Sequence, residues 1–175
     1  MKIAATLILS SLIVLTLAAF SAKDRSTRPL SGDTSSYLAE IHGAVNVNSR
    51  GEAEFGVVKA REGSSDAFIL SLGAHSPDGS VLFTRSSGGP LAAGIYTVVS
   101  RDSNPNQIQA LIMTGSLEHP TGVFWAESGS LIVTSASDSL VSGRFQVRGT
   151  GFLASNPNDE NETIGATGTF TASRH

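Results

Sequence analysis

The feature that most constrains the fold is an alternation of apolar and polar residues with a period of two, which recurs in nearly every apolar segment. In YLAEIHGAVNV, for example, Ala39 and Ile41 alternate with Glu40 and His42. Successive side chains of a β-strand point to opposite faces of the sheet, so this pattern is typical of a strand with one buried and one solvated face. No segment after Phe20 has a sustained helical periodicity. We therefore expect an all-β domain.

Turn signals divide this pattern into strands. The runs 37–47 and 52–60 flank NSRG and are predicted to form one hairpin, and the runs 68–74 and 80–85 flank HSPDG and are predicted to form a second. We expect an antiparallel β-sandwich of about nine or ten strands, with an up-and-down β-barrel as the alternative. Small residues on the inward faces favour the sandwich. The other predicted strands are 94–100, 107–115, 123–127, 129–136, 140–152 and 163–172.

The first 22 residues predict export. Met1 and Lys2 precede an uncharged apolar run from Ile3 to Phe20, which ends in small residues and is followed by charge. This pattern indicates a secretory signal peptide, cleaved after Ala19, Ser21 or Ala22; an uncleaved membrane anchor is the alternative. Residues 23–36 lack apolar periodicity and are interpreted as a flexible leader. Residues 37–175 are then a single domain, long enough for one self-sufficient core.

The charge of the chain bears on the class of partner, and its cysteine content bears on covalent links. Loss of Lys2 with the signal peptide reduces the 12 basic side chains to 11, against 15 acidic ones. Phosphate backbones and anionic membranes are bound by clustered Lys and Arg, and the sequence has no such cluster, so we expect no nucleic-acid partner and no membrane partner after cleavage. The chain has no cysteine, which excludes disulfides and a lipid-modified cysteine.

The tetrapeptide SNPN occurs at residues 103–106 and again at 155–158. The residues that flank the two copies share no pattern, whereas an internal duplication would extend into the neighbouring strands. Asn, Ser and Pro each favour turns for separate physical reasons. We therefore interpret the two copies as independent turns.

The stretch GSLIVTSASDSLVSGRFQVRGTGF, followed by IGATGTFTAS, resembles the C-terminal part of small uncharacterised secreted bacterial β-domains. The resemblance covers Gly129 to Ser173, about a third of the chain, and rests mainly on hairpin residues. It implies a sandwich-like fold and no activity. Many such domains carry a lipoprotein cysteine, which is absent here.

Motifs for catalysis are missing. The sequence has no GxSxG elbow, no HExxH, no P-loop and no cysteine nucleophile. His75 and His119 lie beside prolines in turn-like contexts, and His42 lies on the polar face of a predicted strand. We expect a protein that is not an enzyme and has no cofactor.

Two groups of residues are candidate metal ligands. Glu40 and His42 share one strand face, but the predicted hairpin register places Asn46 opposite Glu54 and His42 opposite Val58, which brings no third ligand close. The acidic loop NPNDENE is a weak calcium candidate without EF-hand spacing. We therefore predict no metal site. The residues of the weak calcium candidate are Asn158, Asp159, Glu160 and Glu162.

Binding residues are the remaining candidates. Arg144, Gln146 and Arg148 alternate on the polar face of one predicted strand and form a possible ligand-contacting stripe. Trp125 is a possible stacking anchor, although burial of both Trp125 and Phe124 is the favoured expectation. The sequence thus predicts a secreted noncatalytic domain that binds an extracellular glycan or protein, or self-assembles. A small-ligand carrier in a lipocalin-like barrel is the alternative, and a secreted hydrolase comes third.

Overall fold

A computed structural model describes residues 35–58, 66–86, 89–100, 104, 106–159 and 161–175. The expected signal peptide, and the leader up to residue 34, lie outside the described residues. No helix of the described part is long and apolar enough to cross a membrane. The described residues form ten strands: β1 (Ser36–Gly43), β2 (Val47–Gly51), β3 (Ala53–Val58), β4 (Ala67–Leu72), β5 (Gly79–Arg85), β6 (Gly94–Val98), β7 (Gln107–Gly115), β8 (Pro120–Ala136), β9 (Leu140–Leu153) and β10 (Glu162–Arg174).

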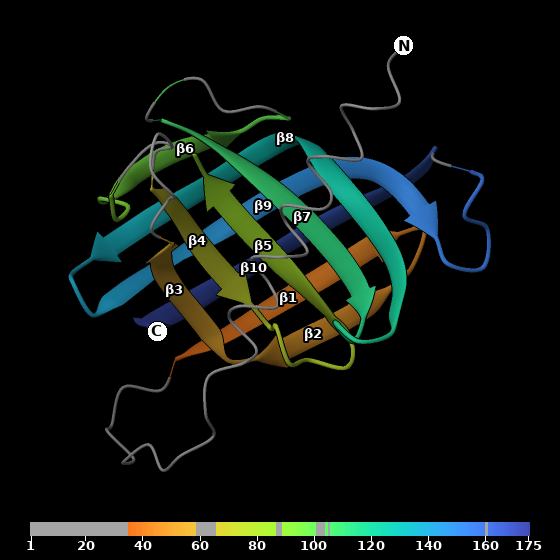
Figure 1. Cartoon of the computed structure of the whole chain (residues 1–175), viewed down its shortest axis with the longest axis horizontal. Coiled ribbons are helices and arrows are strands. Elements are labelled where there is room, and N and C mark those ends of the chain that lie inside the picture. The colour runs from red at the N-terminus through yellow and green to blue at the C-terminus, as the bar shows by residue number, and fades with distance from the viewer. Residues whose placement is uncertain (1–34, 59–65, 87–88, 101–103, 105, 160) are drawn as a thin grey trace. The chain divides into compact units, whose positions relative to one another are not determined.

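The ten strands belong to one sheet, in the order β2-β1-β10-β3-β4-β5-β7-β6-β8-β9. Additional pairings of β9 with β10 and of β7 with β8 bring the sheet back on itself. In Figure 1, β3, β4, β5 and β7 cross in front of β9, β10 and β1. The all-β fold is therefore confirmed, and it combines the closed pairing of a barrel with the facing walls of a sandwich. The sheet is mixed, because β3 with β10 and β6 with β7 pair in parallel over short stretches.

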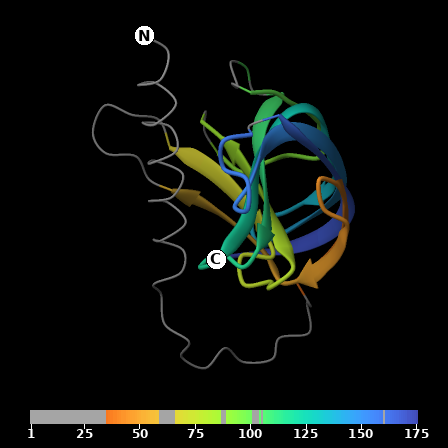
Figure 2. The same cartoon turned by 90° about the vertical axis from the view of Figure 1, so that its right-hand side faces the viewer.

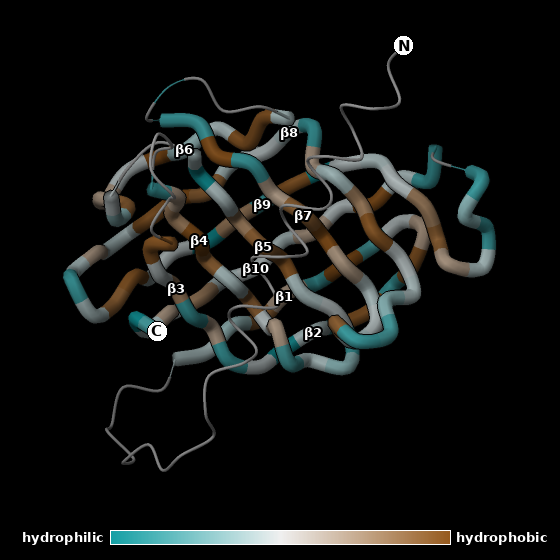
Figure 3. Tube along the Cα trace, viewed as in Figure 1, coloured by the Kyte–Doolittle hydropathy of each residue, from teal (hydrophilic) through white to brown (hydrophobic). Residues whose placement is uncertain are grey.

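The interior between the two walls is filled by side chains from alternate positions of the strands. Figure 2 shows the walls curving around this interior, and Figure 3 shows hydropathy alternating along the strands. The rings of Phe83 on β5 and Phe145 on β9 meet edge to face with centroids 5.5 Å apart. Because these two strands belong to opposite walls, the two rings close the middle of the interior. The rings of Phe55 on β3 and Phe68 on β4 stack with their centroids 6.1 Å apart.

The hairpin expected between residues 37–47 and 52–60 is wrong. The chain turns earlier, at Gly43, and β1 pairs with β2 instead, so Asn48 lies opposite Glu40. Gly43 has φ 117, and the amide of Ala44 donates to the carbonyl oxygen of Thr163 at 2.8 Å. A residue with a Cβ is strained at this φ, so the glycine sets the turn. The NSRG residues lie in β2, and β3 pairs with β4.

The other strand predictions are confirmed with one change. The second hairpin, β4 with β5, forms around HSPDG. The runs 123–127 and 129–136, which were predicted as two strands, are one long strand, β8, with a register shift between Ala126 and Ser128. Gly129 directly follows this shift with φ 137, so the bend that looks like a strand boundary in the sequence is accommodated within the strand.

A buried hydroxyl cluster ties β1 and β2 to the turn before β5. The hydroxyl groups of Tyr37 and Ser49 both donate to the carbonyl oxygen of Gly79, at 2.9 and 2.7 Å. The hydroxyl oxygen of Ser49 also lies 3.1 Å from that of Ser76. All three hydroxyl-bearing residues are buried, so the cluster satisfies polar groups that would otherwise be desolvated without partners.

The C-terminal residues close the sheet at β3. Ser173 and Arg174 pair with Glu54 and Phe55, and the amide of His175 donates to the carbonyl oxygen of Phe55 at 2.9 Å. The imidazole Nδ1 of His175 lies 3.3 Å from the carboxylate of Glu54. His175 is therefore held against β3 by both its backbone and its side chain.

Candidate functional site

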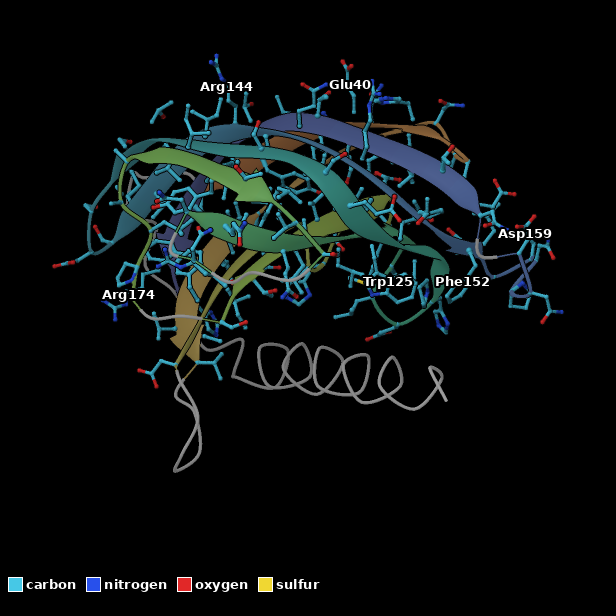
Figure 4. The ribbon with its side chains drawn as sticks, turned by 90° about the horizontal axis from the view of Figure 1, so that it is seen from above. Glu40, Trp125, Arg144, Phe152, Asp159 and Arg174 are labelled. Atoms are coloured by element: carbon cyan, nitrogen blue, oxygen red, sulfur yellow. The ribbon has the colours of Figure 1, made fainter. Side chains whose placement is uncertain are left out.

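A groove runs over the outer face of β2, β1, β10, β9 and β8. Its floor lies on β10, where Thr167 and Thr169 point outward with short side chains. Its walls lie on the neighbouring strands β1 and β9, whose outward side chains are longer. Figure 4 shows Glu40 and Arg144 standing on this same face of the molecule. The groove is therefore a consequence of short side chains on a central strand between two strands with long ones.

The register of β10 with β1 and β9 determines which wall residues flank each threonine of the floor. Thr167 pairs with Glu40 on one side and Gln146 on the other, and Thr169 pairs with Leu38 and Arg144. Adjacent strands lie about 4.8 Å apart, so the backbones of β1 and β9 are about 10 Å apart. The groove therefore has a width suited to an extended chain.

The groove continues onto the outer strands and has a volume of about 1010 Å³. Asn48 and Arg50 of β2 extend it beyond β1, and Ser130 and Ile132 of β8 extend it beyond β9. Leu38 is 61% exposed, which makes it one of two large apolar side chains that stand out into solvent in the described part of the chain. The lining thus combines charges, amides and hydroxyl groups with small apolar surfaces.

At both ends of the floor, a side chain from a neighbouring strand lies over or contacts β10. At one end, His42 lies over Gly165: a Cβ added there would stand 2.6 Å from the Nε2 atom of the ring. At the other end, the hydroxyl of Ser142 donates to that of Thr171 at 3.1 Å. The open floor is therefore the short stretch between Gly165 and Thr171.

The polar side chains of the groove are available to a ligand. In the part of the chain that the structure describes, Glu40, Arg50, Arg144 and Gln146 make no side-chain hydrogen bond or ion pair. Guanidinium and amide groups donate hydrogen bonds, and carboxylate and hydroxyl oxygens accept them, so both kinds of partner are offered. Such an arrangement is suited to holding a polar ligand in place.

The residues predicted to bind a ligand do not all lie in the groove. Arg144 and Gln146 line the groove, as the stripe on one strand face suggests. Arg148 continues the same wall but lies opposite Gly165, beyond the end that His42 covers. Trp125 lies elsewhere: Figure 4 shows it beside Phe152, away from Arg144 and Glu40.

Trp125 and Phe124 differ in burial. Phe124 is fully buried in the core, whereas Trp125 points outward and is half-buried. The Trp125 ring packs against Phe152, with centroids 6.1 Å apart and the planes tilted by 44°. The expectation that both rings are buried between layers is therefore wrong for Trp125.

In the described part of the chain, neither candidate metal site brings a cluster of ligands together. The described residues contain no group of three or more His, Cys, Asp or Glu side chains that could hold a metal ion. The assumed register was wrong, since His42 lies opposite Gly165 and not Val58. In the calcium candidate, the Asp159 carboxylate accepts a hydrogen bond from the Asn161 amide at 3.1 Å, Asn158 is exposed, Glu162 begins β10, and Glu160 lies outside the described residues.

The histidines considered for catalysis come from separate places. His42 lies on the outer face of β1, His75 in the turn between β4 and β5, and His119 in the turn between β7 and β8. All three are exposed. No hydrogen bond joins any of these rings to a carboxylate or a hydroxyl group within the described ranges.

Sequence reasoning missed most of the groove. Leu38, Asn48, Arg50, Thr167 and Thr169 line it, but none of them was predicted. The alternating threonines of residues 163–171 were a usable signal, because they indicate an outer face of short polar side chains. One of the two strands that flank that face, β1, pairs with β10 from a distant part of the chain, and this pairing is not visible in the sequence.

Comparison of the chain with models of protein families, with curated proteins and with solved structures finds no match.

Proposed function

We propose that this protein is a secreted, noncatalytic module that binds a glycan in the groove over β10. The observation that carries the proposal is the lining of the groove: a floor of threonines between walls of charged and amide side chains that have no partner among the described residues. Sugar hydroxyl groups both donate and accept hydrogen bonds, so they match a lining that offers both. Leu38 and Ile132 supply apolar contacts for the C–H faces of sugar rings.

A glycan is favoured over an extended peptide. A peptide that binds by strand addition needs an unpaired sheet edge, but β1, β10 and β9 each have a neighbour on both sides at the groove. The large apolar side chains that point outward in the lining are Leu38 and Ile132, whereas a protein partner is usually anchored by aromatic side chains in well-packed pockets. A polar ligand that lies flat over the side chains suits this face better.

The alternatives have weaker support. A carrier of the lipocalin type needs an open interior, whereas Phe83 and Phe145 from opposite walls touch in the middle of this one. A hydrolase needs a nucleophile or acid beside a base, whereas His42, His75 and His119 lie in separate parts of the fold.

Export of the protein is part of the proposal and rests on the apolar run from Ile3 to Phe20. N-terminal sequencing of the exported protein should find a first residue between Phe20 and Lys23. A product that retains Met1 and sediments with membranes would support the anchor instead.

The test of glycan binding is isothermal titration of the exported protein with a panel of soluble neutral and acidic polysaccharides. We expect saturable binding to at least one of them, with no release of reducing ends. The double variant Asn48→Ala/Gln146→Ala should weaken this binding about tenfold or more, since it removes two amides that pair with the ligand. Asn158→Ala, the same kind of truncation in the exposed loop before β10, is the matched control and should bind normally. Binding to none of the polysaccharides would contradict the proposed function.

A further inference from the structure

Charge is distributed unevenly over the described part of this acidic protein. The lining of the groove contains two of its five arginines, Arg50 and Arg144, and two of its ten acidic residues, Glu40 and Asp78, so the rest of the described chain has three arginines and eight acidic residues. The strand β9, which supplies one wall, contains no acidic residue at all. The lining of the groove is therefore balanced in charge, whereas the rest of the described chain has an excess of acidic residues.

The arginines are arranged along the groove. Arg144 and Arg148 lie on the same face of β9, with Gln146 between them. At about 3.3 Å per residue, their Cα atoms are about 13 Å apart along the wall. Arg50 lies across the groove in the row that contains Leu38, Thr169 and Arg144. Anionic groups repeated along a polymer could thus contact more than one guanidinium.

We infer that the ligand of the groove is an acidic polysaccharide, whose carboxylate or sulfate groups contact Arg50 and Arg144 while its hydroxyl groups contact Glu40 and the threonine floor. The inference rests on the proposed function and specifies its ligand class. Arginine presents a planar set of donors that fits carboxylate and sulfate oxygens, and neither groove arginine is already paired within the described residues. Arg148 extends the same wall beyond the covered end and contributes attraction at longer range.

The experiment compares binding of the exported protein to polygalacturonate, dextran sulfate and neutral dextran by isothermal titration. We expect binding to one or both acidic polymers at least about tenfold tighter than to dextran, because hydrogen bonds to charged groups are stronger than neutral ones. A preference between the two acidic polymers distinguishes carboxylate from sulfate recognition. Arg50→Gln/Arg144→Gln should lose about tenfold or more in affinity for the acidic polymer.

Three further variants separate the groove from general charge attraction. Arg174→Gln removes one positive charge at the far end of β10, as the single variant Arg144→Gln does in the groove, and should bind normally, whereas Arg144→Gln should bind more weakly. Thr167→Leu fills the floor without changing the charge and should weaken binding about as much as the double arginine variant. If Thr167→Leu binds normally, or Arg174→Gln is as weak as Arg144→Gln, only diffuse attraction is present and the inference is overturned.

The failures of the two proposals are distinguishable. Equal binding to dextran and to the acidic polymers would overturn the acidic ligand but leave glycan binding intact. Binding to none of the polysaccharides would overturn both. Binding of single-stranded DNA with the same dependence on Arg144 and Thr167 would replace the polysaccharide by a nucleic acid and overturn the inference.

Discussion

Side-chain length at single positions creates the groove. Thr167 and Thr169 are short, and their neighbours across β10 are Glu40, Gln146 and Arg144. A long side chain in place of either threonine would fill the floor while leaving the core on the other face of β10 unchanged, because residues on the two faces alternate. The proposed binding at this site therefore depends on positions that contribute little to stability.

The adjacent rings Phe124 and Trp125 give a test of burial at residue resolution. Phe124→Ala should lower the free energy of unfolding by about 3 to 5 kcal/mol, because it leaves a cavity in the core. Trp125→Ala should cost about 1 to 2 kcal/mol, mainly through the lost contact with Phe152. Urea unfolding followed by circular dichroism measures both. Equal costs would mean that Trp125 is as deeply packed as Phe124.

Gly73 is constrained by Tyr37. Its φ is 79, and an added Cβ would overlap the Tyr37 hydroxyl group, so Gly73→Ala should cost about 3 kcal/mol or more from backbone strain and displacement of the ring. Tyr37→Phe removes only the hydroxyl group and should cost about 1 kcal/mol, since Ser49 still donates to Gly79. The urea concentrations at the unfolding midpoints of the two variants show which substitution costs more. A milder effect of Gly73→Ala than of Tyr37→Phe would contradict this account of the cluster.

At the scale of elements, the close approach of β8, β9 and β10 depends on glycines whose neighbours differ. A Cβ added at Gly149 would overlap the backbone of Trp125 on β8, which is held in the sheet. The three atoms nearest to a Cβ added at Gly165 all belong to the His42 ring, which can move. The same residue type is therefore structural in one strand and replaceable in the next.

This difference predicts the stability of two matched variants. Gly149→Ala should destabilise the protein by about 2 kcal/mol or more, because the backbone of β8 must shift. Gly165→Ala should stay within about 1 kcal/mol of the parent protein, because an exposed side chain gives way. Thermal unfolding of the two variants, compared at equal concentration, measures the difference. Similar melting temperatures would show that β8 adjusts as easily as His42.

At the scale of the whole molecule, the ring of strands has a weak point. β10 and β3 meet over only two residue pairs, whereas β10 pairs with β9 along most of its length. The bonds from His175 to Phe55 and Glu54 lie at this junction. Closure of the sheet thus depends on the last residues of the chain.

Removal of Arg174 and His175 should therefore loosen β3 without unfolding the protein. We expect faster hydrogen exchange of the β3 amides and a loss of about 1 to 2 kcal/mol in the free energy of unfolding. The truncation removes the backbone bonds to Phe55 and Ser139 and the side-chain contacts with Glu54 and Asp138. His175→Ala keeps the backbone bond to Phe55 and is the control, with little change expected. Unchanged exchange in the truncated protein would show that closure does not depend on these residues.

The sequence by itself determined the class of the fold and the face on which each side chain lies. Alternation placed Arg144 and Gln146 outward and Phe145 inward, and turn residues located the β4 to β5 hairpin, because these are local properties of a strand and of φ. The tertiary structure alone decided which strands are neighbours. The pairing of β10 with β1 joins segments far apart in the chain, and the turn at Gly43 that sends β1 to β2 is held by the bond from the amide of Ala44 to Thr163 of β10. The groove forms only where those pairings set long side chains on either side of short ones, so its residues could not be read from the alternation.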